Sequence, residues 1–161
     1  MSQVAKVSFA GYQGSISKAL DLLEAGGRLP QAGLIIIKLK DHSFTGTTVA
    51  MKNMFGIAPG KFYAGGWNKS RLHSPSTHKS VVDVCLYKKP DLSVVDASVA
   101  LNGSHLSGRH KNVGLILAGF DPVAVDAVGS ELLGHNPQRL EYLALANGRL
   151  GSMDHIHIVE G

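Results

Sequence analysis

Cysteine is almost absent from this sequence: Cys85 stands alone among 161 residues. A single cysteine excludes a disulfide framework, and it excludes any zinc or iron–sulfur site built from the cysteines of one chain. We therefore expect no iron–sulfur cluster within this chain. Cys85 lies in the apolar segment 81–86, which favours an inert, buried thiol over a reactive one.

Long hydrophobic segments are also missing. The longest apolar runs, such as residues 34–37, are far too short to span a bilayer. Residues 1–10 alternate apolar and polar side chains, unlike the continuous apolar core of a signal peptide. These features predict a cytoplasmic protein without membrane association.

Several common catalytic motifs do not occur. The sequence has no P-loop, no Gly-x-Gly-x-x-Gly, no nucleophile elbow and no Cys-x-x-Cys. Their absence removes support for the standard dinucleotide, nucleoside triphosphate, hydrolase and thioredoxin functions.

What the sequence does contain is an alternation of strand-like and helix-like segments. Strands are predicted at 4–10, 33–38, 92–97, 113–118 and 155–159, the last as a possible edge strand. Helices are predicted at 16–25, 77–87, 122–134 and 137–148, with a short one near 51–55, and loops at 61–77 and 102–112. Strands separated by helices predict an α/β fold, a mainly parallel sheet with helices on both faces, in a single domain over residues 1–161.

Helix caps are the clearest local signals. Asp121-Pro122 and Asn136-Pro137 each place a capping side chain before a proline at the first helical position. Ser15 and either Ser76 or Thr77 are further candidate N-caps. Gly26-Gly27 is the expected end of the first helix.

Positive charge is concentrated in residues 38–79. This window holds seven Lys and Arg against one acidic residue, Asp41, whereas the rest of the chain has nine basic and eleven acidic residues. Three histidines and five of the ten aromatic residues lie in the same window. A basic, hydroxyl-rich loop after an apolar strand is typical of anion sites in α/β proteins.

The candidate anion ligands are lysines and hydroxyl residues of this window. Cations supply charge, while hydroxyls and the N–H groups of the following helix supply direction. The alternative is a solvated basic surface, although Lys38 ends an apolar strand, where a buried position is expected. The residues concerned are Lys38, Lys40, Lys52, Thr45, Thr47 and Thr48.

Four further residues are candidates for chemistry. His42, beside Asp41, is a potential general base or metal ligand, or simply an exposed side chain. Asp96 and Asp121 each follow an apolar strand, where α/β sites form, although Asp121 is also explained as a helix cap. If the strands are parallel, Lys38, His42, Asp96 and Asp121 should converge at one edge of the sheet. Asp126 should face either the cleft or solvent.

Lys52 is the candidate for covalent chemistry. It follows Thr48 by four residues, so on a helix both side chains share one face. Like charge from Lys38 and Lys40 disfavours its ammonium form, and this increases the nucleophilic fraction of the amine. The alternative is that Lys52 only adds to a phosphate clamp.

Three ordered segments identify the chain as a member of a known family. The segments 38–56 (Lys-Leu-Lys-x-His through Lys-Asn-x-Phe-Gly), 90–97 and 117–127 resemble the signatures of the domain of unknown function 362 (DUF362) family. The resemblance covers residues 34–161. Residues 4–37 resemble the family's first strand–helix–strand unit but run directly into the Lys-Leu-Lys-x-His segment, which makes the chain an internally shortened member. Asp41 replaces a small residue of its relatives.

The resemblance implies a family of unsettled activity whose members often accompany iron–sulfur proteins, so an iron–sulfur partner protein is possible. Lys52-Asn53 with Pro59-Gly60 is also similar, more weakly, to the N-terminal domain of nickel-dependent lactate racemases. By that similarity Lys52 would carry a cofactor, and His42 would be a ligand or base.

These observations lead to one main hypothesis and two alternatives. The main hypothesis is a small anionic ligand or cofactor bound at the carboxyl edge of the sheet, with a redox or racemase-like enzymatic role left open. Lys38, Lys40, Thr45, Thr48, Lys52, Asn53 and Asp121 would hold the ligand, with His42, Asp96 and Lys52 as reactive groups. The alternatives are a nucleic-acid-binding module using Phe55, Phe62, Tyr63 and Trp67 as stacking surfaces, and an inactive interaction module. The sequence leaves the substrate, any metal and the oligomeric state open.

Overall fold

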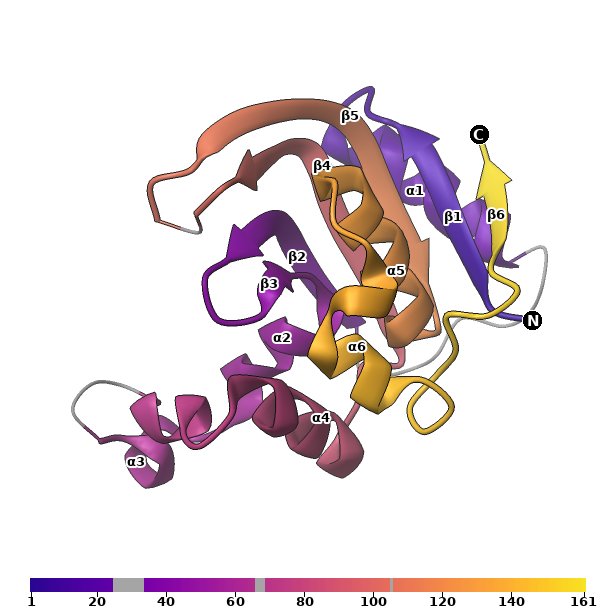
Figure 1. The fold of residues 1–161 in the computed structure, drawn as a ribbon. Coiled ribbons are helices and arrows are strands. Elements are labelled where there is room, and N and C mark those ends of the chain that lie inside the picture. The colour runs from indigo at the N-terminus through magenta and orange to yellow at the C-terminus, as the bar shows by residue number, and fades with distance from the viewer. Residues whose placement is uncertain (25–33, 66–68, 105) are drawn as a thin grey trace.

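The structure, a computed structural model, describes residues 1–24, 34–65, 69–104 and 106–161. Within these residues the core is a six-stranded sheet with the strand order β3-β2-β4-β5-β1-β6 (Figure 1). The strands are β1 (Gln3–Ser8), β2 (Leu34–His42), β3 (Gly46–Thr48), β4 (Leu92–Asn102), β5 (Arg109–Gly119) and β6 (His157–Glu160). The α-helices are α1 (Tyr12–Glu24), α2 (Ala50–Asn53), α3 (Gly60–Tyr63), α4 (Thr77–Tyr87), α5 (Pro122–Leu133) and α6 (Glu141–Ala146). Short 3₁₀ turns are η1 (Met54–Ile57), η2 (Ser70–His73) and η3 (Pro137–Arg139).

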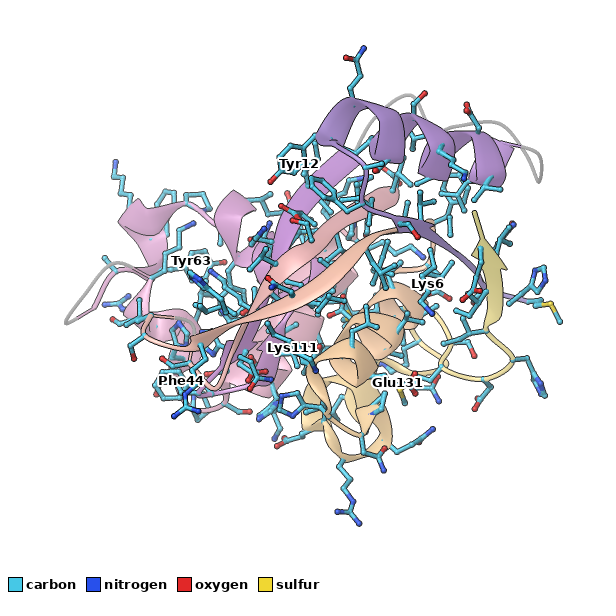
Figure 2. The ribbon with its side chains drawn as sticks, turned by 90° about the horizontal axis from the view of Figure 1, so that it is seen from above. Lys6, Tyr12, Phe44, Tyr63, Lys111 and Glu131 are labelled. Atoms are coloured by element: carbon cyan, nitrogen blue, oxygen red, sulfur yellow. The ribbon has the colours of Figure 1, made fainter. Side chains whose placement is uncertain are left out.

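The helices cover both faces of the sheet. On one face, Ala19 and Leu23 of α1 pack with Val94 of β4 and Ile116 of β5. On the other face, the apolar side of α5 packs against β2, β4 and β5. Figure 2 shows Tyr12 of α1 and Glu131 of α5 on opposite sides of the sheet. The α/β class with helices on both faces is therefore confirmed.

The sheet is mixed, whereas a mainly parallel one was expected. Pairs β2–β4 and β1–β6 are parallel, while β2–β3, β4–β5 and β1–β5 are antiparallel. The difference arises because β4 and β5 are joined directly as a hairpin, with no helix between them. β5 therefore runs opposite to β4, and Ser93 at the start of β4 pairs with Gly119 at the end of β5.

This hairpin also corrects the loop expected at 102–112. β4 continues to Asn102 and β5 starts at Arg109, because the polar ends of the two strands pair with each other. Leu101, for example, lies opposite His110. Figure 1 shows the tip of the hairpin extending beyond the rest of the sheet, over β2 and β3.

Most of the predicted caps are present. Ser76 Oγ accepts from Lys79 N at the start of α4, and the Asp121 carboxylate accepts from two N–H groups of α5. Gly134, with φ at 96°, ends α5, and Asn136 starts η3. Ser15 is not a cap: α1 begins earlier, at Tyr12. Its hydroxyl accepts from Ala10 N and donates to the carbonyl of Ser8. The helix end expected at Gly26-Gly27 lies outside the described residues.

The sequence predicted the position of β6 correctly, but not the exposure of β2. β6 is an edge strand, as predicted. β2 was expected to be covered on both faces, but Ile36 is 60% exposed, so one face of β2 is open. The stretch expected to be a loop from residue 61 to 77 contains part of α3 and the turn η2. Along the described ranges, no helix has the length and apolar character required to cross a bilayer.

Candidate anion-binding site

β2 places its basic side chains on one face. Side chains alternate along a strand, so Lys38, Lys40 and His42 point away from the face that carries Leu39. Leu39 is completely buried in the core beneath α5. The three basic residues therefore lie on the face opposite α5, at the carboxyl end of the strand.

Lys38 forms an ion pair with Asp96. The two residues are partners in the parallel register of β2 and β4, and Lys38 Nζ lies 2.9 Å from Asp96 Oδ2. Asp96 also accepts from Ser98 N, from Ser98 Oγ and from the hydroxyl of Tyr12 at 3.0 Å. Burial acts to raise the pKa of Asp96, but the hydrogen bonds from Lys38, Ser98 and Tyr12 outweigh it and lower the pKa below its ordinary value. A carboxylate with so many donors holds Lys38 in place and is a weak base.

Lys38 itself is less buried than its position after an apolar strand suggested. Its side chain is 47% exposed. The reason is the open face of β2, the same face that leaves Ile36 exposed. Lys38 thus presents its ammonium group to solvent while Asp96 fixes its direction.

Lys52 is the buried member of a cluster of three lysines, Lys40, Lys52 and Lys69. It lies in the single turn of α2, is only 8% exposed, and its Nζ stands 4.1 Å from the centre of the Phe55 ring. Among the described residues, Lys52 Nζ makes no hydrogen bond and no ion pair. Burial, reinforced by the positive charges of Lys40 and Lys69, lowers the pKa of Lys52 from 10.5 to about 8. The burial and the neighbouring positive charges lower this pKa, and a bound anion would offset both effects.

Lys69 belongs to the same cluster, although it was not a predicted site residue. Its Nζ donates to the carbonyl oxygens of Phe55 and Gly56 at 2.7 and 3.0 Å. These bonds hold the turn η1 against the segment before η2, and they bring a second cation close to Lys52. Lys40, on β2, is the third.

Two histidines and two phenylalanines form the wall beside these cations. The rings of His42 and His73 are stacked, with centroids 6.2 Å apart, and Phe44 and Phe55 each contact His73. Phe44 N donates to His42 Nδ1, so a neutral His42 ring carries its proton on Nε2. His42 is 9% exposed and therefore largely buried. His73, 31 positions later, was not a predicted site residue, because only the folded turn η2 brings it to β2.

The predicted hydroxyl ligands have separate roles. Thr45 Oγ1 donates to the carbonyl of Thr47 and so stabilises the β2–β3 turn. Thr48 pairs with Lys40 across β2 and β3, and its buried Oγ1 has no hydrogen-bond partner among the described residues. Asn53 is half-buried at the end of α2. Thr48 is thus the hydroxyl that remains available to a ligand.

Asp126 holds α2 in position. It is fully buried, and its carboxylate accepts from Ala50 N, from Met51 N and from the hydroxyl of Tyr142. Burial raises its pKa to about 7, against the opposing effect of these donors. The expectation that Asp126 faces the cleft or solvent is wrong. The N–H groups at the start of α2, expected to bind the ligand, are instead taken by Asp126.

The apolar neighbours of Asp126 were the signal for its burial. Val123, Ala124, Val125, Ala127 and Val128 surround it in the sequence, so α5 has no polar face to place it on. A carboxylate in such a helix requires donors from another element.

Two other aspartates lie away from the cluster. Asp121 follows β5, which runs opposite to β4, so it reaches the other end of the sheet from Asp96. There it accepts from Ser2 Oγ and Ser152 N as well as capping α5. The expected convergence of four residues is therefore wrong for Asp121. Asp41 turns to the α5 face, where it contacts His135 Nε2 at 2.7 Å and accepts from Gly103 N.

Cys85 confirms the expectation of an inert thiol. It is 1% exposed, and burial raises its pKa to about 12. In the described part of the chain, no group of three or more His, Cys, Asp or Glu side chains is arranged to hold a metal ion.

These features define a class: an α/β protein with a mixed sheet and a cluster of lysines around the buried Lys52. The sequence profile of the family described as Domain of unknown function (DUF362) matches residues 16–131. The chain belongs to the DUF362 family, which confirms the resemblance found in the sequence.

One curated relative gives the scale of the match. Thylakoid-associated protein sll1697 of Synechocystis sp. is 32% identical over 115 residues, which are 71% of this chain and 36% of the relative. The chain therefore spans little more than a third of the relative's length. No solved structure matches the chain. Similarity to nickel-dependent lactate racemases is not shown by these comparisons.

Proposed function

We propose that the protein binds a small organic anion, a carboxylate or a phosphate, at the cluster of Lys40, Lys52 and Lys69. The observation that carries this proposal is the buried Lys52, whose ammonium group has no anionic partner among the described residues. A buried charge without a partner is costly, so proteins rarely keep one that has no ligand to bind. A bound anion would supply the missing partner.

Neighbouring groups support the same ligand. Thr48 Oγ1, buried and unpartnered in the described residues, can donate to an anion oxygen. Lys38, held by Asp96, extends the positive region, and His42 lies along the same face of β2. Asn53, at the end of α2, is a further candidate ligand, and Thr45 contributes by fixing the turn that carries Thr48.

Asp121 does not contribute to this proposal, because it lies at the other end of the sheet. Asp96 acts as a positioning residue for Lys38. His42 is the candidate for proton transfer if the bound anion also reacts.

Titration of the full chain with inorganic phosphate and, separately, pyruvate tests the proposal. We expect a saturable rise in the melting temperature with at least one of these probes, since a ligand at 100 times its Kd stabilises the folded state by about 2.7 kcal/mol. Lys52→Met should abolish the rise. Lys6→Met is the matched control, because Lys6 lies on β1, away from the cluster, and forms an ion pair with the exposed Glu160. A response in Lys52→Met equal to that of the unchanged chain would reject the site.

The nucleic-acid alternative requires exposed aromatic side chains on a basic face. Phe55 is 6% exposed, and its ring faces Lys52 and His73. Phe62 and Tyr63 are exposed, but they line an apolar groove of about 790 Å³ between α3 and α4. Trp67 lies outside the described residues. The small anion is therefore the better-supported ligand, and the groove is the feature that favours an interaction module as the second candidate.

Two further expectations remain proposals. A cytoplasmic location can be tested by cell fractionation. The alternative outcome is recovery with thylakoid membranes, as the name of the relative suggests. An iron–sulfur partner protein can be tested by co-purification followed by iron analysis.

A further inference from the structure

The environment of Lys52 does more than attract an anion. A buried amine beside Lys40 and Lys69 is held partly in its neutral form. With a pKa of about 8, about a tenth of the amine is neutral at pH 7, against roughly one part in three thousand for an ordinary lysine. Only the neutral amine is a nucleophile.

The position of Lys52 suits a reaction with a small molecule. Lys52 keeps an exposed fraction of 8%, whereas the adjacent Met51 has none. The hydrogen bonds of Asp126 to Ala50 N and Met51 N fix the turn that carries it. No carboxylate of the described residues neutralises the amine or competes for it. A fixed and unpaired amine suits covalent lysine chemistry.

We infer that Lys52 forms an imine with a small carbonyl compound that carries a carboxylate or phosphate group. This inference rests on the proposed anion site, which would bring the acidic group of the compound to Lys40 and Lys69. The neutral amine attacks the carbonyl carbon, and a carbon–nitrogen bond forms. The two hydrogens lost from nitrogen leave with the carbonyl oxygen as one molecule of water, so no oxidant or reductant is needed. The face of Phe55 favours the protonated, cationic imine.

The charge of the compound should decide the reaction. Lys40 and Lys69 attract an acidic carbonyl compound, and they offer nothing to an uncharged aldehyde of similar size. Lysines exposed on the surface, such as Lys18, lack the buried surroundings of Lys52. Selectivity for Lys52 and for an anionic reagent is therefore the mark of this site.

Reductive trapping tests the inference. The full chain is incubated with pyruvate, glyceraldehyde 3-phosphate or uncharged butyraldehyde in the presence of cyanoborohydride, and peptides are mapped by mass spectrometry. We expect one dominant adduct, on Lys52, with at least one anionic reagent. Its formation should be at least about tenfold faster than at any other lysine. The rate should rise with pH towards 8, and butyraldehyde should show no such preference. Labelling spread evenly over exposed lysines, or an unmodified Lys52, would overturn the inference.

Two variants separate this inference from the anion site. Lys52→Arg keeps the charge but cannot form an imine, so it should lose the adduct and retain stabilisation by phosphate. Lys52→Met, whose side chain suits the apolar surroundings, should lose both the adduct and the stabilisation by phosphate. If the unchanged chain is stabilised by pyruvate but gives no adduct, the imine is rejected and the anion site stands. If neither probe stabilises the chain and no adduct forms, both proposals fail.

Discussion

Lys52 destabilises the fold that contains it. Its pKa of about 8 in the folded chain lies below the ordinary value of 10.5, so folding disfavours the charged form. Each unit of such a difference corresponds to about 1.4 kcal/mol. The cost is present in full below pH 8 and disappears as the pH rises to 10.5, because the unfolded chain holds the proton more tightly over that range.

Replacing Lys52 by Met should therefore stabilise the protein. Met has a similar length and packs well beside Met51 and Phe55, so the substitution removes the buried charge without leaving a cavity. We expect the free energy of unfolding at pH 7 to rise by about 1–3 kcal/mol. Urea unfolding at pH 7 and at pH 10.5 provides the measurement, and the gain should shrink at the higher pH. A variant no more stable than the unchanged chain at pH 7 would contradict this account.

At this scale the sequence predicted part of the site. The lowered pKa of Lys52 was predicted from like charge, but burial is its largest cause, and the neighbouring cations are Lys40 and Lys69. The predicted helix face shared by Thr48 and Lys52 is wrong, because Thr48 ends strand β3 and α2 begins at Ala50. The sequence predicted that Lys38 and Asp96 lie close together, and the parallel pairing of β2 and β4 places them side by side. The roles of Lys69 and His73 could not be predicted, because they depend on irregular turns with no periodic pattern.

Among the elements, α2 depends most on a distant partner. A four-residue helix is not stable alone, and no side chain of its own segment caps it. Asp126 of α5 provides the cap, and Tyr142 of α6 donates to the same carboxylate. The position of Lys52 is therefore determined by α5 and α6.

Removing this cap should loosen the site. Asp126→Ala leaves two buried N–H groups and the Tyr142 hydroxyl without their acceptor, so we expect a loss of about 2–4 kcal/mol. Tyr142→Phe should remove part of the same interaction, and the double variant should show a coupling of about 1 kcal/mol. Urea unfolding of the three variants measures this coupling energy. Strictly additive losses would show that the two side chains act independently.

Asp126 also makes the free energy of unfolding depend on pH. The pKa of Asp126 is raised from 3.8 to about 7, so its protonated form is favoured by folding. The stability it contributes is complete below pH 3.8 and is lost as the pH rises through 7. The difference in unfolding free energy between the unchanged chain and Asp126→Ala should therefore narrow from pH 4 to pH 8. A difference that widens would mean that the ionised carboxylate is the favoured form.

Gly129 sets the distance between α5 and β2. A Cβ atom at this position would lie 3.0 Å from Val49 Cγ1 and 3.3 Å from Leu39 Cδ1. Alanine gains about 1 kcal/mol of helix propensity, but overpacking a tight core costs about 1–3 kcal/mol. We expect Gly129→Ala to destabilise the chain by about 1 kcal/mol, as measured by thermal unfolding. Adding Val49→Ala should restore room for the methyl group, so a double variant that loses the full sum of both changes would contradict this explanation.

The elements were predicted better than their connections. Caps and apolar runs located α4, α5 and most strands, because those signals are local. The β4–β5 hairpin was missed because its outer halves are polar and read as a loop. Because of this hairpin, β5 runs antiparallel to β4 instead of parallel to it. Asp121, which follows β5, therefore lies at the opposite end of the sheet from the predicted one.

For the whole molecule, charge distribution distinguishes the possible ligands. The net charge is +4, and the basic window 38–79 holds the entire excess. We expect no measurable binding of single-stranded oligonucleotides at about 50 mM salt, since Phe55 is buried and a counterion-driven complex would be strongest there. Fluorescence anisotropy with a labelled oligonucleotide provides the measurement. Tight binding that weakens steeply with salt would favour the nucleic-acid function instead.

The contact between Ala50 and Asp126 spans 76 positions of the chain, and this has a consequence for biosynthesis. Domains fold as they are synthesised, at about 5–20 residues per second, so Asp126 is made roughly 4–15 s after Ala50. During that interval α2 has no cap, and Lys52 remains an ordinary solvated lysine. The emerging chain therefore acquires its unusual amine only after α5 has left the ribosome.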